Sequence, residues 1–87
     1  MAVYSLLFKR QVEKDFRKID RRYRKKILYE IEGLKKLPRP SNSRKMTNTE
    51  ITYRLRVGDY RVIYQIDDDA KVITIFYVRQ RQDAYKQ

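Results

Sequence analysis

Apolar residues recur at two different spacings along the chain, and each spacing predicts a different kind of element. Residues 9–20 carry a single stripe at the i, i+4, i+7 spacing of an amphipathic helix: Val12, Phe16 and Ile19. Residues 21–37 continue this period over a longer segment: Tyr23, Ile27, Ile31 and Leu34. The pattern predicts two consecutive helices, preceded by a short β-prone strand in residues 1–8.

Capping and helix-breaking residues indicate where these helices begin and end. Asp20 can accept hydrogen bonds from the first free N–H groups of the second helix and so cap it. Gly33 weakens that helix slightly. The proline-containing stretch 38–43 ends it and starts a loop.

From Ile51 onward the hydrophobic period changes from 3.6 to 2, as in β-strands. One side of the first strand carries Ile51, Tyr53, Leu55 and Val57, and the other carries Thr52, Arg54 and Arg56. Turns at Gly58–Asp59 and at residues 67–69 lead into further strands at residues 60–66 and 71–78.

These elements predict an α+β fold with the order β-α-α-β-β-β. We expect residues 1–87 to form a single domain, with both helices packed on one face of a small, mainly antiparallel sheet. The pattern leaves open which edge of the sheet the first strand joins. It also leaves the second face of the sheet partly uncovered, with Arg54 and Arg56 as candidates to occupy it.

Composition adds a strong positive charge and removes several kinds of chemistry. The 22 Lys and Arg residues against 11 Asp and Glu give a net charge of +11, which favours binding to polyanions. The chain contains no cysteine and no histidine, so thiolate sites and the commonest general base are excluded. Without cysteines, a signal peptide or a long apolar run, the expected location is the cytoplasm, away from membranes.

Positive charge concentrates in the first part of the chain, where residues 1–50 hold 15 basic and 6 acidic side chains. Its densest point is the start of the second helix: Arg21, Arg22, Arg24, Lys25 and Lys26. Two interpretations of this cluster remain open, a solvated helix face or a surface that docks on RNA phosphates.

The segment YRLRVGDYRVIYQI, the ending VRQRQDAY and the order of elements together resemble the RelE/ParE family of type II toxins. The resemblance extends from the opening strand to Tyr85. It implies a small toxin that a cognate acidic, RelB-like antitoxin neutralises in a hetero-oligomer. RelE-like members enter the ribosomal A site and cleave mRNA there without a metal or other cofactor, whereas ParE-like members inhibit DNA gyrase.

The RelE branch uses basic residues on two neighbouring strands, a late arginine and a tyrosine near the C-terminus. By motif, the resemblance places these catalytic roles on Arg54, Arg56, Arg61, Arg81 and Tyr85. The chain departs from some relatives by having arginines where lysines occur, and Gln80 where a histidine can precede the late arginine. All five positions carry suitable groups, which favours the RelE branch.

Cleavage by the RNA's own 2′-hydroxyl needs a base, positive charge on the phosphorane and a proton for the leaving 5′-oxygen. Arg61 suits the phosphate clamp, because a guanidinium stays charged and matches two phosphate oxygens. Arg81 resembles the proton donor of the family. For the base, Tyr85 and Lys45 are both candidates, while Arg79 is either structural or in contact with RNA.

Two other functions compete with mRNA cleavage. One is gyrase inhibition in the manner of ParE, and the other is RNA binding without catalysis. The run Asp67–Asp69 superficially resembles a metal site, but three adjacent turn residues cannot all face one ion, so we expect a solvated turn and no metal. Tyr23, Tyr53 and Tyr64 lie on apolar-periodic positions and are expected in the core.

Overall fold

A computed structural model of the chain describes residues 3–80, so Arg81 and Tyr85 lie outside the described residues. The first half contains β1 (Ser5–Phe8), α1 (Arg10–Arg17) and α2 (Arg21–Gly33). The second half contains β2 (Ser43–Lys45), β3 (Thr52–Val57), β4 (Tyr60–Asp67) and β5 (Val72–Gln80). The predicted order of helices and strands is confirmed, with the addition of β2.

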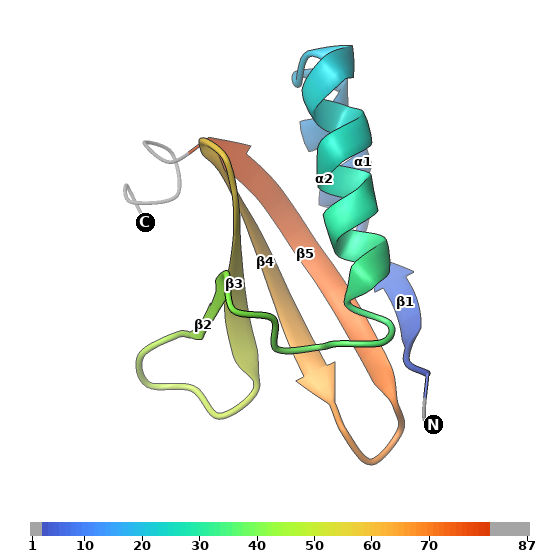
Figure 1. The fold of residues 1–87 in the computed structure, drawn as a ribbon, viewed down its shortest axis with the longest axis vertical. Helices are drawn as coiled ribbons and strands as arrows, with labels where there is room; N and C mark the ends of the chain where they lie inside the picture. The colour runs from blue at the N-terminus through green and yellow to red at the C-terminus, as the bar shows by residue number, and fades with distance from the viewer. Residues whose placement is uncertain (1–2, 81–87) are drawn as a thin grey trace.

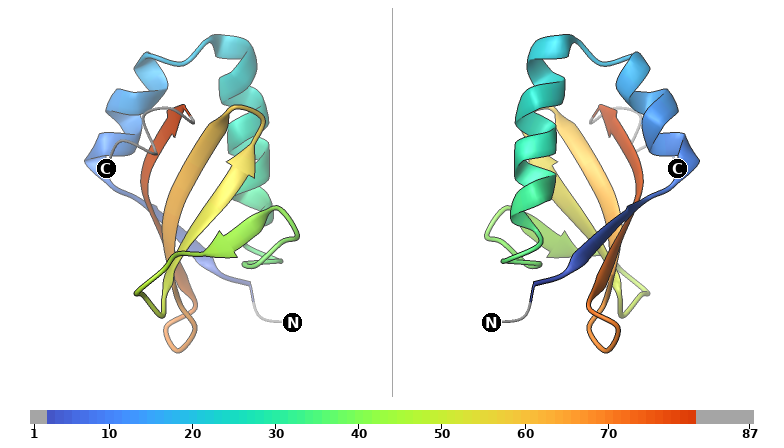
Figure 2. Two further views of the ribbon diagram at one scale, coloured as in Figure 1. Left: turned by 90° about the vertical axis from the view of Figure 1, so that its left-hand side faces the viewer. Right: turned by 90° about the vertical axis from the view of Figure 1, so that its right-hand side faces the viewer.

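The strands form one five-stranded sheet in the order β1-β5-β4-β3-β2. β1 runs parallel to β5, while the remaining pairs are antiparallel. Both helices cover the same face of this sheet (Figure 1). The left panel of Figure 2 looks onto the opposite face, which no helix of residues 3–80 covers. The α+β layering follows the prediction, and β1 takes the edge that the sequence left undecided.

The short strand β2 was not predicted, because residues 38–50 read as a loop. Its sequence, Ser-Arg-Lys, has no apolar residue and offers no period to detect. Tertiary pairing alone makes it a strand: Arg44 lies opposite Arg54, and Lys45 lies opposite Tyr53 on β3. This pairing matters for the site, because it decides which face each of the two basic side chains occupies.

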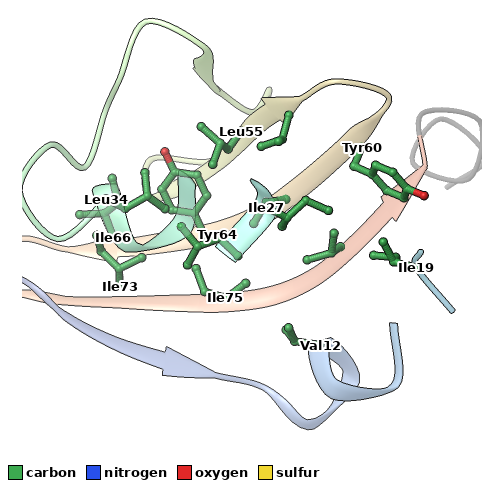
Figure 3. Packing of buried hydrophobic residues seen from close by; sticks show 14 residues of the cluster. Val12, Ile19, Ile27, Leu34, Leu55, Tyr60, Tyr64, Ile66, Ile73 and Ile75 are labelled. Carbon is green, nitrogen blue, oxygen red and sulfur yellow. The ribbon is translucent and has the colours of Figure 1, made fainter. Parts of the chain in front are cut away.

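The core lies between the helices and the sheet (Figure 3). It is built from the apolar positions of both periods: Val12, Ile19, Ile27, Ile31, Leu34, Leu55, Val57, Tyr60, Val62, Tyr64, Ile66, Ile73, Ile75 and Val78. The Tyr64 hydroxyl donates to the Pro38 carbonyl at 2.8 Å, and burial raises the pKa of this phenol to about 12.

The three tyrosines expected in the core have different environments. Tyr64 is fully buried and Tyr53 packs against the core, as predicted. Tyr23 is 49% exposed, so its prediction as a core residue is wrong. Its ring lies 5.7 Å from that of Tyr60 at the rim of the core, because the first turn of α2 extends to the end of the sheet.

Candidate nucleic-acid interface

The alternation of side chains in the central strands places a group of arginines on the face of the sheet away from the helices. Leu55 and Val57 of β3 face the core, so Arg54 and Arg56 project from the opposite face, as the sequence predicts. Cross-strand pairing then sets their neighbours. Arg56 lies opposite Arg61 of β4, which in turn lies opposite Arg79 of β5. We call Arg56, Arg61 and Arg79 the arginine row.

Arg61 differs from its neighbours in the arginine row because its side chain is only 4% exposed. One terminal nitrogen donates to the carbonyls of Tyr60 at 3.2 Å and Gly58 at 3.4 Å, both long for such bonds. Within residues 3–80, no carboxylate lies within 4.0 Å of this guanidinium. A buried cation with only carbonyl acceptors is electrostatically costly, and an anion nearby would offset that cost.

A β-bulge in β5 determines where Arg79 points. Tyr64 pairs with Ile75, whereas the preceding Ile63 pairs with Tyr77, so the register shifts by one residue between them. After the shift, Val78 faces the core and Arg79 faces the arginine row. Unbroken alternation from Ile75 would have directed Arg79 into the core. The sequence does not reveal this shift, because the residues around it, Ile75 to Val78, are all apolar or aromatic.

A second row crosses the sheet beside the first, and it contains an arginine that sequence reasoning missed. Arg44 lies opposite Arg54, which pairs with Ile63, and Ile63 pairs with Tyr77. The Arg79 guanidinium stacks 4.2 Å from the centre of the Tyr77 ring, which links the two rows. Arg44 was overlooked because β2 read as a loop.

Lys45, a candidate base, does not join these arginines. It lies opposite Tyr53, and Tyr53 packs against the core, so Lys45 belongs to the helix-side face at the edge of the sheet. Its ammonium group lies 3.8 Å from a carboxylate oxygen of the exposed Glu50. The described structure therefore separates Lys45 from Arg54, Arg56 and Arg61, which it brings together.

The basic cluster of α2 lies at the same end of the molecule as the β3–β4 turn (Figure 1). Two of its members are engaged locally: Arg24 donates to the Ile19 carbonyl at 2.7 Å, and Arg22 contacts Asp20 at 3.4 Å. The backbone N–H of Arg22 also donates to Asp20, confirming the predicted cap and lowering the pKa of that carboxyl. Arg21, Lys25 and Lys26 are exposed, and no carboxylate of residues 3–80 lies within 4.0 Å of them.

Acidic groups on the strands of this face lie away from the arginine row, while Asp59 occupies the β3–β4 turn beside it. Among the described strand residues on this face, Asp67 is the single carboxylate, at the opposite end of β4 from Arg61. Asp67 accepts the Ala70 N–H, and Asp68 binds Arg39 at 2.8 Å and the Tyr4 hydroxyl at 2.6 Å. Within residues 3–80, no group of three carboxylates is placed to hold a metal ion.

The fold and this surface define a small α+β protein that presents clustered arginines on an open sheet face. Comparison with known proteins identifies the family. The family model described as "ParE toxin of type II toxin-antitoxin system, parDE" matches residues 6–85. The chain therefore belongs to the RelE/ParE family of type II toxins, and its relatives make it a RelE-like member.

The similar proteins match the chain over nearly its whole length. RelE1 of Methanocaldococcus jannaschii is 29% identical over 86 residues, which are 95% of this chain and 96% of that protein. The toxin in the archaeal RelE–RelB complex of Pyrococcus horikoshii OT3 superposes with a TM-score of 0.82 and 30% identity, covering 91% of this chain and 96% of that one. The toxin in the RelB–RelE antitoxin–toxin complex of Methanococcus jannaschii superposes with a TM-score of 0.75 and 25% identity, covering 92% of this chain and 95% of that one. In the described part of this chain, neither helix has the length and hydrophobicity needed to cross a membrane.

Proposed function

We propose that residues 1–87 form one toxin domain that cleaves translated mRNA in the ribosomal A site. The arginine row carries this proposal, because three arginines lie side by side on the face of the sheet that the helices leave free, with the buried Arg61 in the centre. Arg44 and Arg54 extend the positive charge along the neighbouring row. A strip of cations with few acidic neighbours suits a polyanionic strand, and guanidinium groups match phosphate oxygens in pairs.

The proposed reaction is attack of an RNA 2′-hydroxyl on the adjacent phosphate. The 2′-oxygen forms a bond to phosphorus, the bond to the 5′-oxygen breaks, and the products are a 2′,3′-cyclic phosphate and a free 5′-hydroxyl. Negative charge develops on the two non-bridging oxygens in the transition state. Arg61 clamps these oxygens, and Arg56 and Arg54 add to the stabilisation from the neighbouring strand. This scheme uses no metal or other cofactor.

Proton transfer is assigned to residues beyond β5. By the family resemblance, Arg81 protonates the leaving 5′-oxygen and Tyr85 orients or deprotonates the 2′-hydroxyl; both lie outside the described residues. The position of Lys45 on the other face favours Tyr85 over Lys45 as the base. Alignment of the RNA by the ribosome lowers the barrier further, because in-line positioning alone supplies several kcal/mol, ~7–11 in favourable cases.

The proposed partners follow from charge and from the relatives. A net charge of +11 favours both the ribosome and an acidic antitoxin. Two of the similar toxins were solved bound to RelB, so we propose a RelB-like antitoxin for this chain, forming an inactive hetero-oligomer. Arg79, Arg21 and Lys25–Lys26 are proposed RNA or ribosome contacts, alongside Arg22 and Arg24. The site of action is the cytoplasm, where translation occurs.

A reconstituted translation system tests this function directly. Purified toxin is added to an mRNA with and without ribosomes, and the products are mapped by primer extension. The proposal expects cleavage within the translated region that depends on ribosomes and leaves 5′-hydroxyl ends. Intact mRNA at toxin concentrations that stop growth would contradict it.

The matched family model, described as a ParE toxin, gives one specific reason to consider gyrase inhibition as a second function. A gyrase supercoiling assay separates the two. Inhibition of supercoiling with intact mRNA would support the ParE-like function, and cleaved mRNA with unaffected gyrase would support the RelE-like function. Binding of RNA with neither effect would indicate a non-catalytic RNA-binding protein.

A further inference from the structure

Asp15 is a buried carboxylate in α1 that the proposed chemistry does not use. Its side chain is 7% exposed, and Asp15 and Arg61 are the two buried charged residues among residues 3–80. One carboxylate oxygen accepts the Gln11 side-chain amide at 2.9 Å. The other accepts the backbone N–H of Val78 at 3.0 Å, which joins α1 to β5 across 63 positions of sequence. A carboxylate is costly to bury, so this placement calls for a specific role.

The backbone of β5 needs a partner where Asp15 lies. β1 pairs with β5 only from Val72 to Ile75, and the Lys9 N–H makes the last contact, with the Ile75 carbonyl at 2.9 Å. Beyond that point the chain leaves the sheet and enters α1, which lies beside the second half of β5 (Figure 2). The Val78 N–H would lack a strand partner there, and a buried unpaired N–H is costly. Asp15 supplies the missing acceptor.

This contact lies directly after the bulge that orients Arg79. The register shift at Ile63/Tyr64 makes Val78 face the core and Arg79 face the arginine row. A slip of one residue would exchange those two side chains between the faces. In the bulged register the Val78 N–H points away from β4 and bonds to Asp15. The burial of the Val78 side chain selects this register, and the Asp15 carboxylate holds the end of β5 against α1 with Arg79 opposite Arg61.

We propose that Asp15 is a positioning residue, which holds the bulged end of β5 in register and thereby places Arg79 on the RNA-binding face. Its consequence for RNA rests on the proposed function, whereas its effect on β5 does not. Asp15 makes no contact with RNA and transfers no proton in this proposal. It acts through its hydrogen bond to the backbone of Val78.

The first test measures amide hydrogen exchange by NMR in the full chain. Asp15→Ala should lower the protection of the Val78 amide by about tenfold or more, because the N–H loses its acceptor, while the amides of Leu55 and Val62 keep theirs. Asp15→Asn retains an acceptor without charge and should restore most of the protection. Glu13→Ala, which removes an exposed carboxylate of the same helix, is the charge-matched control and should leave Val78 unchanged. Unchanged Val78 protection in Asp15→Ala would overturn the proposal.

The second test measures affinity for a 2′-O-methyl RNA oligonucleotide, which this chemistry cannot cleave. Asp15→Ala should weaken binding severalfold relative to Glu13→Ala, the control with the same change of charge, and Asp15→Asn should recover most of the affinity. In the Arg79→Ala background, Asp15→Ala should cost nothing further, because its effect passes through Arg79. Additive losses, or an effect equal to that of Glu13→Ala, would overturn the positioning role.

The two tests separate this proposal from the proposed function. A wild-type protein that binds the oligonucleotide but cleaves no mRNA would refute catalysis and leave both readouts for Asp15 intact. If Asp15→Ala fails to fold, Asp15→Asn carries the test. The neutral amide oxygen is a weaker acceptor than the carboxylate, so Val78 protection should be a few-fold lower than in the wild type. Asp15→Leu, which has no acceptor, should lose Val78 protection further than Asp15→Asn, and unchanged protection in Asp15→Leu would refute the proposal.

Discussion

Replacing Arg61 with methionine should separate the stability of the fold from its activity. The guanidinium is 4% exposed and rests on two carbonyls at 3.2 and 3.4 Å. Methionine has a similar reach, fills the space with apolar atoms and removes a buried charge. Replacing buried ionic groups with well-packed apolar residues is often neutral or stabilising by about 1–4 kcal/mol. We therefore expect Arg61→Met to unfold at the same denaturant concentration as the wild type or a higher one.

Its activity should change in the opposite direction. Arg61 is the residue we assign to the phosphorane oxygens, where charge develops only in the transition state. Loss of one such donor typically lowers the rate by about 10²–10³-fold, or roughly 2.7–4 kcal/mol. The same substitution should thus leave the fold at least as stable and nearly abolish mRNA cleavage.

The assay compares urea unfolding with the single-turnover cleavage rate on translated mRNA. Arg17→Met serves as the control, because it removes one positive charge from an exposed ion pair with Glu13 on α1. That variant should cleave within a few-fold of the wild type. The reasoning is refuted if Arg61→Met loses several kcal/mol of stability, or if it retains cleavage close to that of Arg17→Met.

Further predictions concern the second row and two titrating side chains. Arg44→Gln should weaken RNA binding and flatten its salt dependence, whereas Lys45→Gln, the adjacent residue on the other face, should do so much less in the same titration. Burial raises the Tyr64 pKa from 10.0 to about 12. The wild type should therefore lose stability relative to Tyr64→Phe as the pH rises from 10 to 12, measured as the free energy of urea unfolding at each pH. A stability difference between the two proteins that does not change over this range would contradict the prediction. Arg39 and Tyr4 lower the Asp68 pKa below its ordinary 3.8. The wild type should therefore be more stable than Asp68→Asn above about pH 3.8, and the thermal midpoints of the two proteins should converge as the pH falls below that value.

Most of the fold could be predicted because its elements follow simple periods. The stripe containing Ile27 and Ile31 gave α2, and the alternation around Leu55 assigned Arg54 and Arg56 to the open face. What could not be predicted depends on contacts between distant segments. β2 forms only because β3 offers it hydrogen bonds, since its own three residues show no pattern.

The site was predictable to the same extent. Arg54, Arg56 and Arg61 come together as strand pairing from the sequence would suggest. The orientation of Arg79 depends on a bulge inside an apolar run, where every residue could face either side. The sequence pointed to Lys45 as a site residue, but the structure places Arg44 beside Arg54 and Lys45 on the other face. Adjacent strand residues face opposite ways, and the register of β2 was unknown from the sequence. The roles of Arg81 and Tyr85 stay predictions.

One measurement tests the central proposal most directly. The chain is expressed from an inducible promoter, and the 5′ ends of cellular mRNA are mapped within minutes of induction, with Arg61→Met expressed in parallel. Cleavage in the ribosomal A site predicts new 5′-hydroxyl ends at one position of the reading frame, confined to translated regions and absent from the variant. New ends spread equally over coding and untranslated regions, or the same ends in Arg61→Met, would contradict it.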